Sequence, residues 1–237
     1  MKFSIVIAET AIETVPKLLY KNTMVKEHAI KLNRRVDELL LDINYHYFAM
    51  KKENLEHREK RGRPDILHIC LLSILSTPLF FERFINVYIH TIDNKVIFVG
   101  ENLRIPKSYR RFEGLMMKLY IEKKIKSQSS SKKSLLELKD MTLEQLIEKI
   151  LKPEAVIGFS TTGNHMELGK ILSENIIKKK GHYVFIIGGF QSGHFSEETI
   201  KRLGKIYSIS RHHLEAHVVI SRLIYECEKF LIVQNPN

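Results

Sequence analysis

Glycines cluster directly after an apolar, strand-like run near the end of the 237-residue sequence. The run at 183–187 is followed by Gly188, Gly189 and Gly193. Glycines at the carboxyl end of a buried strand let the backbone turn sharply and approach a ligand, and open α/β sheets bind cofactors at such strand ends. Taken alone, the pattern fits either a cofactor cradle or an ordinary turn.

The glycine spacing is not that of a dinucleotide-binding loop. It reads G-G-x-x-x-G, and no acidic residue follows about 20 residues on, at a strand end, to hold a ribose. A nicotinamide-dependent oxidoreductase is therefore disfavoured. Covalent catalysis is disfavoured too, because neither Ser192 nor Ser210 lies in a Gly-x-Ser-x-Gly turn.

Basic residues are concentrated in two segments. Lys and Arg number 38 against 27 Asp and Glu, a formal net charge of +11. Such an excess is typical of nucleic-acid-binding proteins, whose phosphate contacts are salt-sensitive and largely blind to sequence. A basic surface that serves only solubility could carry the same net charge, but the clustering of the basic residues favours nucleic-acid binding. The first cluster is Arg58, Lys60, Arg61 and Arg63, and the second is Arg104, Lys107, Arg110 and Arg111.

An acidic residue stands beside the first cluster. Pro64 predicts the first turn of a helix, where Asp65 would stabilise the positive end of the helix dipole. A carboxylate two residues from Arg63 can also hold that guanidinium in a fixed bidentate pose. In the second cluster, Tyr109 and Phe112 could stack on unpaired bases, although core packing is commoner for aromatic residues at this spacing.

Histidine and cysteine give no metal site. The chain has eleven histidines, and His213 and His217 stand four apart. Their sequence, His-Leu-Glu-Ala-His, is not H-E-x-x-H, and no third ligand suggests itself, so we predict no metal. Cys70 and Cys227 lie in apolar helical patterns and are predicted to be core residues of a cytoplasmic protein without disulfides.

The elements that must position these residues form an α/β pattern. Strand-like runs alternate with helical ones, which predicts a largely parallel sheet, with a hairpin between 85–90 and 95–99. Residues 11–60 read as charged helix and residues 123–134 as a mobile surface loop. No stretch reaches the ~20 apolar residues of a membrane span, and Ser210 is a plausible N-cap of the last helix. The runs are 2–8, 85–90, 95–99, 155–159, 183–187 and 205–209.

Four dispersed motifs resemble those of the small-subunit rRNA pseudouridine-N1 methyltransferases, which are ribosome-biogenesis proteins of the SPOUT (α/β-knot) superfamily. An archaeal member is the best match. The motifs follow the family's order over nearly the whole chain. They are Arg-Gly-Arg-Pro-Asp-Ile-Leu-His (61–68), Leu-Arg-Ile-Pro-x-x-Tyr-x-Arg-Phe-x-Gly-Leu-Met (103–116), Ile-Gly-Gly-Phe (187–190), and Ser-Ile-Ser (208–210) with Leu-Glu-Ala (214–216).

The resemblance implies one domain, 1–237, with family-specific insertions at about 40–62 and 85–135. It also implies a C-terminal trefoil knot, S-adenosylmethionine held by three knot loops, and a homodimer formed through knot helices. Small-subunit rRNA would be the substrate, and other assembly factors or ribosomal proteins are conceivable partners. The implied cofactor-binding residues are Thr162, Gly163, Gly188, Gly189, Gly193, Ile209, Ser210, Arg211, His212, His213 and Leu214.

The resemblance assigns RNA contacts and one catalytic candidate. Asp65 would either orient Arg63 or take the proton that N1 of the target pseudouridine loses when it is methylated. Lys107 stands where some relatives are expected to have arginine. A lysine at this position retains the attraction to phosphate but weakens planar recognition. A second hypothesis, an RNA-binding assembly factor whose methylation is dispensable, fits the same basic surface. The implied RNA contacts are Arg61, Arg63, Arg104, Lys107 and Arg111.

Overall fold

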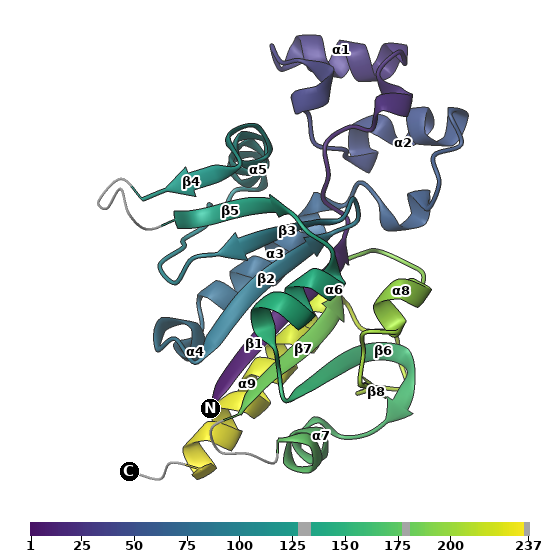
Figure 1. Cartoon of the computed structure of the whole chain (residues 1–237). Coiled ribbons are helices and arrows are strands. Elements are labelled where there is room, and N and C mark those ends of the chain that lie inside the picture. Colours follow the sequence, from purple (N-terminus) through teal and green to yellow (C-terminus); the bar gives the residue numbers. More distant parts are fainter. Residues whose placement is uncertain (128–133, 177–180, 235–237) are drawn as a thin grey trace.

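The computed structural model describes residues 1–127, 134–176 and 181–234. Within them lies one eight-stranded sheet, in the order β4-β5-β3-β2-β1-β7-β6-β8 (Figure 1). The strands are β1 (Lys2–Thr10), β2 (Ile85–Thr91), β3 (Lys95–Val99), β4 (Lys124–Lys126), β5 (Ser134–Asp140), β6 (Ala155–His165), β7 (His182–Gly188) and β8 (Lys205–Ser208).

The sheet has a parallel half and an antiparallel half. Strands β2, β1, β7, β6 and β8 pair in parallel, with Ile5 of β1 opposite Val87 of β2 and Phe185 of β7. The predicted hairpin is confirmed, because β2 and β3 pair antiparallel, and β5 and β4 extend this half. Parallel strands place their carboxyl ends at the same edge, where ligands bind in open α/β sheets.

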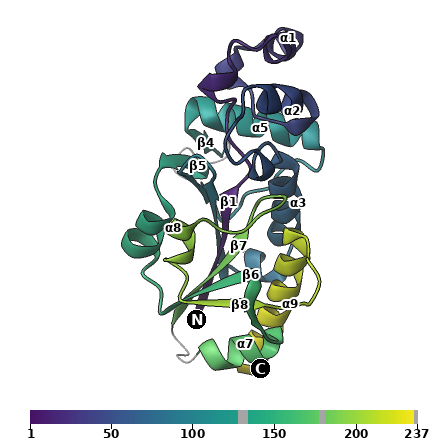
Figure 2. The same cartoon turned by 90° about the vertical axis from the view of Figure 1, so that its right-hand side faces the viewer.

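Helices cover both faces of the sheet. In Figure 2, α3 and α9 lie on one face and α8 on the other. Among the described residues, no helix combines the length and apolar character needed to cross a membrane. The helices are α1 (Thr23–Lys31), α2 (Ile43–Lys52), α3 (Pro64–Leu75), α4 (Pro78–Phe81), α5 (Tyr109–Glu122), α6 (Leu143–Gln145), α7 (Leu168–Asn175), α8 (Glu197–Ile200) and α9 (Ala216–Gln234), with the 3-10 helices η1 (Lys17–Leu19), η2 (Val36–Glu38) and η3 (Arg58–Lys60) and the π-helix η4 (Leu146–Leu151).

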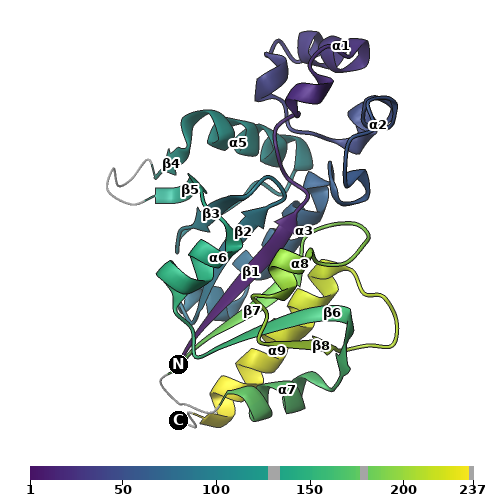
Figure 3. The same ribbon diagram turned by 45° about the vertical axis from the view of Figure 1, so that its right-hand side comes forward.

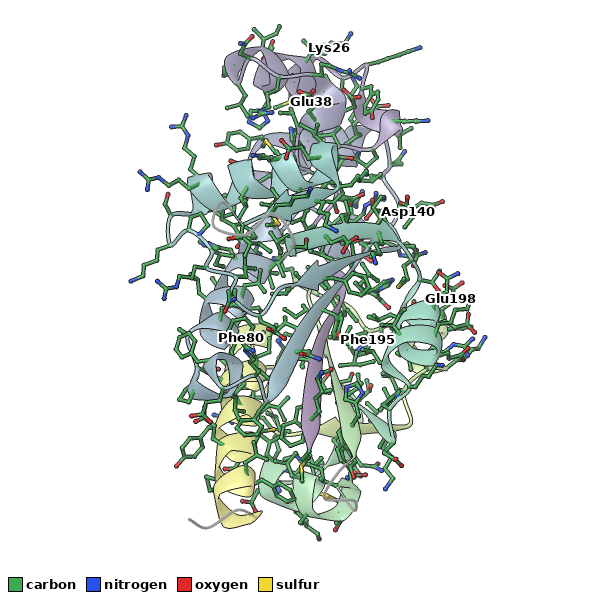
Figure 4. All side chains as sticks on the ribbon, turned by 60° about the vertical axis from the view of Figure 1, so that its left-hand side comes forward. Lys26, Glu38, Phe80, Asp140, Phe195 and Glu198 are labelled. Atoms are coloured by element: carbon green, nitrogen blue, oxygen red, sulfur yellow. The ribbon has the colours of Figure 1, made fainter. Side chains whose placement is uncertain are left out.

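Each face of the sheet has its own apolar core. Along β1, Phe3, Ile5 and Ile7 join the core beneath α3 and α9, whereas Val6 and Ala8 join the core beneath α6 and α8. This alternation follows from the two-residue period of a strand. In Figure 4, labelled residues of the two cores, Phe80 and Phe195, lie on opposite sides of the sheet.

The predicted core cysteines and helix starts are largely confirmed. Cys70 and Cys227 are buried and unpaired, and α3 begins at Pro64. The last helix begins later than predicted, at Ala216 rather than directly after Ser210. The hydroxyl of Ser210 instead accepts a hydrogen bond from the His212 N–H at 3.0 Å, which stabilises a local turn. Residues 209–215 therefore remain a loop.

The prediction of a surface loop at 123–134 is wrong at both ends. Lys124–Lys126 form β4 and Ser134 begins β5, while residues 128–133 lie outside the described residues. Leu136 and Leu138 of β5 are buried, and they alternate with charged residues. That two-residue alternation is the signature of a strand with one solvated face, and the Ser- and Lys-rich composition beside it obscured the signal.

The chain between β1 and α3 forms a helical appendage above the sheet (Figure 1), as the helical pattern at 11–60 predicted. Two buried histidines join its helices, with 3.0 Å between Nδ1 of His28 and Nε2 of His46. Nδ1 of His46 accepts from the Asp42 N–H at 3.1 Å, so His46 carries its proton on Nε2 and donates it to His28. Burial, and then the neighbouring His28, lower the pKa of His46 from 6.5 to about 4.

Acid should weaken this appendage. The pKa of His46 is lower in the folded than in the unfolded chain. The stability that neutral His46 contributes to the fold is therefore fully present above about pH 6.5 and is lost as the pH falls through about 4. We expect His46 to account for about 3 kcal/mol of the decrease in unfolding free energy between roughly pH 7 and pH 4. Urea unfolding of wild type and His46→Gln at both pH values measures this. Equal pH dependence in the two proteins would contradict it.

Candidate functional site

A hollow lies at the carboxyl ends of β7 and β8, beside the stretch of β6 between Phe159 and Asn164 where the pairing register shifts. Its volume is about 730 Å³ including its open mouth. Its wall is formed by residues within 159–161, 187–195 and 207–216, together with Val219. Figure 3 shows that the loops after β7 and β8 emerge on the same side of the molecule. Two of the three segments that the resemblance marked as cofactor loops, those within 188–193 and 209–214, therefore meet around one pocket, which residues 159–161 of β6 complete.

Most, but not all, of the predicted cofactor residues line this pocket. Thr162 and Gly163 border a smaller neighbouring hollow instead. The amide of Gly189 donates to the Ala8 carbonyl at 2.8 Å, which places Gly189 against the end of β1. Arg211 is exposed and is not part of the lining. The predicted residues that do line the pocket are Gly188, Gly193, Ile209, Ser210, His212, His213 and Leu214.

Gly193 has a backbone conformation that its loop requires. Its φ of +98° lies in a region that residues with a Cβ rarely adopt. A Cβ there would also lie 3.1 Å from Cε of Lys60. The turn that carries the loop past the pocket is therefore specific to glycine.

Several residues of the pocket wall were not among the predicted cofactor contacts. The rings of Phe190 and Phe195 meet edge to face, with 5.8 Å between centroids, and both line the pocket. Ser160 and Glu215 contribute polar groups to the wall. Phe190 and Glu215 lie within the motifs 187–190 and 214–216, which could have marked them, whereas Ser160 and Phe195 lie outside all four motifs.

Arg63 and Asp65 form the bidentate pair that the sequence suggested. Nε and Nη2 of Arg63 donate to the two carboxylate oxygens of Asp65 at 2.8 and 2.7 Å. These hydrogen bonds, with smaller contributions from Asp65 and Glu215 as charges, raise the pKa of Arg63. Since Glu215 also lines the pocket, the pair lies within electrostatic reach of the pocket wall. Backbone bonds hold it there: the Arg63 N–H donates to the Ala11 carbonyl at 3.1 Å, and the Ala11 N–H donates to the Gly189 carbonyl at 2.9 Å.

Two cations of the first basic cluster point inward. Nε and Nη2 of Arg61 donate to the two carboxylate oxygens of Glu13 at 2.6 and 2.5 Å, and the Arg61 side chain is only 17% exposed. Nζ of Lys60 donates to Glu9 at 2.8 Å. The guanidinium of Arg61 is therefore engaged inside the protein, so clustering in the sequence overstated the charge available for phosphates.

The second basic cluster is exposed. Arg104, Lys107 and Arg111 lie on the surface around the start of α5, and no ion pair engages them within the described residues. The aromatic residues beside them have structural roles. Phe112 is fully buried and stacks on His68 with 4.5 Å between ring centroids, while Tyr109 donates to Asp42 at 2.6 Å. The core alternative is confirmed for Phe112, whereas Tyr109 is half-buried against the core.

Fold and site together define an α/β protein with a loop-built pocket for a small molecule at its strand ends and a basic surface nearby. Residues 5–228 match the model of the EMG1/NEP1 methyltransferase family. The chain therefore belongs to the EMG1/NEP1 methyltransferase family.

Known proteins resemble the chain over nearly its whole length. It is 41% identical to the ribosomal RNA small subunit methyltransferase Nep1 of Staphylothermus marinus, over 95% of this chain and 94% of that protein. It is 37% identical to the protein of the same name from Saccharolobus solfataricus, over 98% and 99%. The crystal structure of Archaeoglobus fulgidus Nep1 bound to S-adenosylhomocysteine superposes with a TM-score of 0.83 at 35% identity, covering 97% of this chain and 98% of that one.

Proposed function

We propose that this chain is a methyltransferase that transfers a methyl group from S-adenosylmethionine to N1 of a pseudouridine in small-subunit rRNA. One observation carries the proposal: a pocket at the strand ends, built from the loops after β7 and β8 and from residues 159–161 of β6, in a chain whose relative of the same fold was crystallised with S-adenosylhomocysteine. That compound is what remains of S-adenosylmethionine after methyl transfer.

The wall of the pocket suits this cofactor. Ile187, Leu214 and Val219 offer apolar surface for an adenine ring. Ser160 offers a hydroxyl, and the carboxylate of Glu215 complements a positive charge. S-adenosylmethionine supplies an electrophilic methyl group on a cationic sulfur. The residues present therefore fit the group, and this mixed lining is typical of cofactor sites.

The chemistry of the target explains why pseudouridine is required. Its sugar is attached through carbon, which leaves N1 as a free N–H, whereas N1 of uridine carries the sugar. The protein must extrude the base, align N1 with the donor and exclude water, so positioning supplies much of the rate. We propose that Arg63 contacts the target nucleotide and that Asp65 fixes its guanidinium. The engagement of both Asp65 oxygens by Arg63 supports the orienting role over that of a base.

Labelled S-adenosylmethionine tests the proposal directly. Wild type should label small-subunit rRNA that already carries pseudouridine and leave large-subunit rRNA unlabelled. Asp65→Asn should slow transfer without changing the shape of the pH–rate profile around neutral pH, because an orienting carboxylate holds Arg63 but takes no proton from N1. Absence of label from small-subunit rRNA would contradict the proposed reaction, and a changed pH profile would make Asp65 the base.

The exposed basic surface should contact phosphates. Removing Arg104 or Arg111 should weaken RNA binding and reduce the slope of log affinity against log salt by ~0.7 per contact, the value for single strands. Titration of a labelled rRNA hairpin at several salt concentrations measures the slope. Lys170→Ala is the matched control, since Lys170 is exposed on α7, far from α5 (Figure 1). A slope unchanged from wild type in Arg104→Ala and Arg111→Ala would show that these side chains face away from the RNA.

Other parts of the proposal rest on the sequence resemblance. They are a trefoil knot at the C-terminus, a homodimer formed through the knot helices, and a single domain over 1–237 with insertions at about 40–62 and 85–135. A cytoplasmic location and contacts with other assembly factors or ribosomal proteins belong to the same set. Sedimentation of the purified chain would test the homodimer, which a monomer at all concentrations would contradict.

A further inference from the structure

A buried carboxylate stands at the carboxyl end of β1 in a strained backbone conformation. Glu9 has a φ of +48°, which is uncommon for a residue with a side chain, and it is 4% exposed. Its two oxygens have different partners. Oε2 accepts from Nζ of Lys60 at 2.8 Å, and Oε1 accepts from the Ser196 N–H at 2.7 Å. Strained residues of this kind persist where the surroundings hold them, and they cluster at functional sites.

Lys60 connects this carboxylate to the glycine loop. Its ammonium lies 4.7 Å from the centre of the Phe190 ring, and its side chain is 10% exposed. Its aliphatic stem lies against Gly193, since a Cβ on that glycine would be 3.1 Å from Cε of Lys60. Lys60 therefore contacts the pocket wall without lining the pocket.

Glu9 and Lys60 thus hold the loop between β7 and α8 at both ends. Lys60 packs on Phe190 and Gly193, which line the pocket, and Glu9 binds the backbone at Ser196, directly after Phe195. Burial opposes the charged form of Glu9, but hydrogen bonds from Lys60 and Ser196 outweigh it and lower its pKa. The carboxylate stays charged at neutral pH, when the loop must hold its shape.

We propose that Glu9 and Lys60 are positioning residues for the cofactor, which together hold the loop 188–196 in the shape that forms the pocket wall. This inference rests on the proposed function, because it names the ligand of the same pocket. The pair acts through Phe190, Gly193 and Ser196 and touches no reacting atom. Holding a loop in its bound shape raises affinity because less conformational entropy is lost on binding.

A second ion pair provides a matched control. Arg61 and Glu13 also join the first basic cluster to the chain just after β1, with Glu13 buried and the Arg61 side chain 17% exposed. Neither residue contributes to the pocket wall. Glu13→Gln should therefore lower the temperature of unfolding while leaving the affinity for S-adenosylhomocysteine within about twofold of wild type.

Calorimetric titration of the full chain with S-adenosylhomocysteine tests the inference. Lys60→Met and Glu9→Gln should each weaken binding by about tenfold, the change expected when a charge-assisted hydrogen bond that supports the loop is lost. Lys60→Arg should restore part of the affinity. In turnover, KM for S-adenosylmethionine should rise while KM for rRNA stays constant. The double variant should lose less than the two single losses combined, because the residues act as a unit.

The outcomes separate this inference from the proposed function. Wild-type affinity in folded Lys60→Met and Glu9→Gln would overturn the inference alone, as would an equal loss in Glu13→Gln. Absence of S-adenosylhomocysteine binding by wild type would overturn the proposed function. If a single variant does not fold, the double variant, which leaves no buried charge unpaired, is titrated in its place.

Discussion

Gly193→Val should severely reduce methyl transfer, at S-adenosylmethionine concentrations near the wild-type dissociation constant, while the chain stays folded. Valine cannot adopt a φ of +98° without strain of roughly 1–3 kcal/mol, and its Cβ would press on Lys60 at 3.1 Å. The loop must therefore leave the shape that lines the pocket. We expect affinity for S-adenosylhomocysteine to fall by about 10- to 100-fold, as measured by calorimetric titration, with rRNA affinity unchanged.

Ser192→Val is the matched control for this substitution. Ser192 is the exposed neighbour of Gly193, is not part of the pocket wall, and loses on substitution only a long hydrogen bond, 3.4 Å, from its hydroxyl to the Glu59 carbonyl. The same valine there should leave S-adenosylhomocysteine binding close to that of wild type. Full methylation by Gly193→Val would show that the loop is not a cofactor loop.

Gly193→Val also separates the two hypotheses about biological role, a methyltransferase whose product is required and an assembly factor whose methylation is dispensable. In a cell that depends on this protein, a methyltransferase whose product is required would fail with Gly193→Val. An assembly factor whose methylation is dispensable would still bind the pre-ribosome and support growth. Growth and rRNA methylation measured in the same strain give the answer.

Gly163→Ala should destabilise the edge of the sheet where the pocket lies. A Cβ at this position would lie 2.6 Å from the Tyr207 amide nitrogen and 2.7 Å from the carbonyl of Ile206. Both are backbone atoms of β8, so no side-chain rotation relieves the clash. We expect the free energy of unfolding in urea to fall by about 1–3 kcal/mol, the usual cost of overpacking.

Gly114→Ala adds the same methyl group where space is open. Nothing lies within 4 Å of a Cβ on Gly114, which is inside α5. The free energy of unfolding of that variant should rise by about 0.5–1 kcal/mol, because alanine has a higher helix propensity than glycine. If Gly163→Ala instead kept wild-type stability and lost only S-adenosylhomocysteine affinity, Gly163 would be a cofactor contact, as the resemblance implies, rather than a packing residue.

Local patterns predicted much of the fold. Apolar runs such as 183–187 are long and buried on both faces, so they indicated parallel strands without reference to the rest of the chain. Strand β5 was missed because its outward residues are charged and a Ser- and Lys-rich stretch precedes it. The start of α9 was misplaced because a serine can stabilise a turn as well as a helix, and Ser210 does the former.

The site was predictable where backbone geometry requires a residue type and unpredictable where it depends on distant partners. The cluster that includes Gly193 marked the pocket because only glycine tolerates that turn. The pair Lys60–Glu9 joins residues 51 apart in the sequence, and Arg61–Glu13 joins residues 48 apart. Basic residues can be counted in a sequence, but their partners become evident only when the chain is folded.

The most direct test of the central claim compares two rRNA hairpins that differ in one loop nucleotide, uridine or pseudouridine. Methyl transfer from labelled S-adenosylmethionine is measured on both under the same conditions. We predict transfer to the pseudouridine hairpin alone, because only that base has a free N1–H. Transfer to both hairpins would mean that N1 is not the target, and tight binding of both without transfer would contradict the assignment as a methyltransferase.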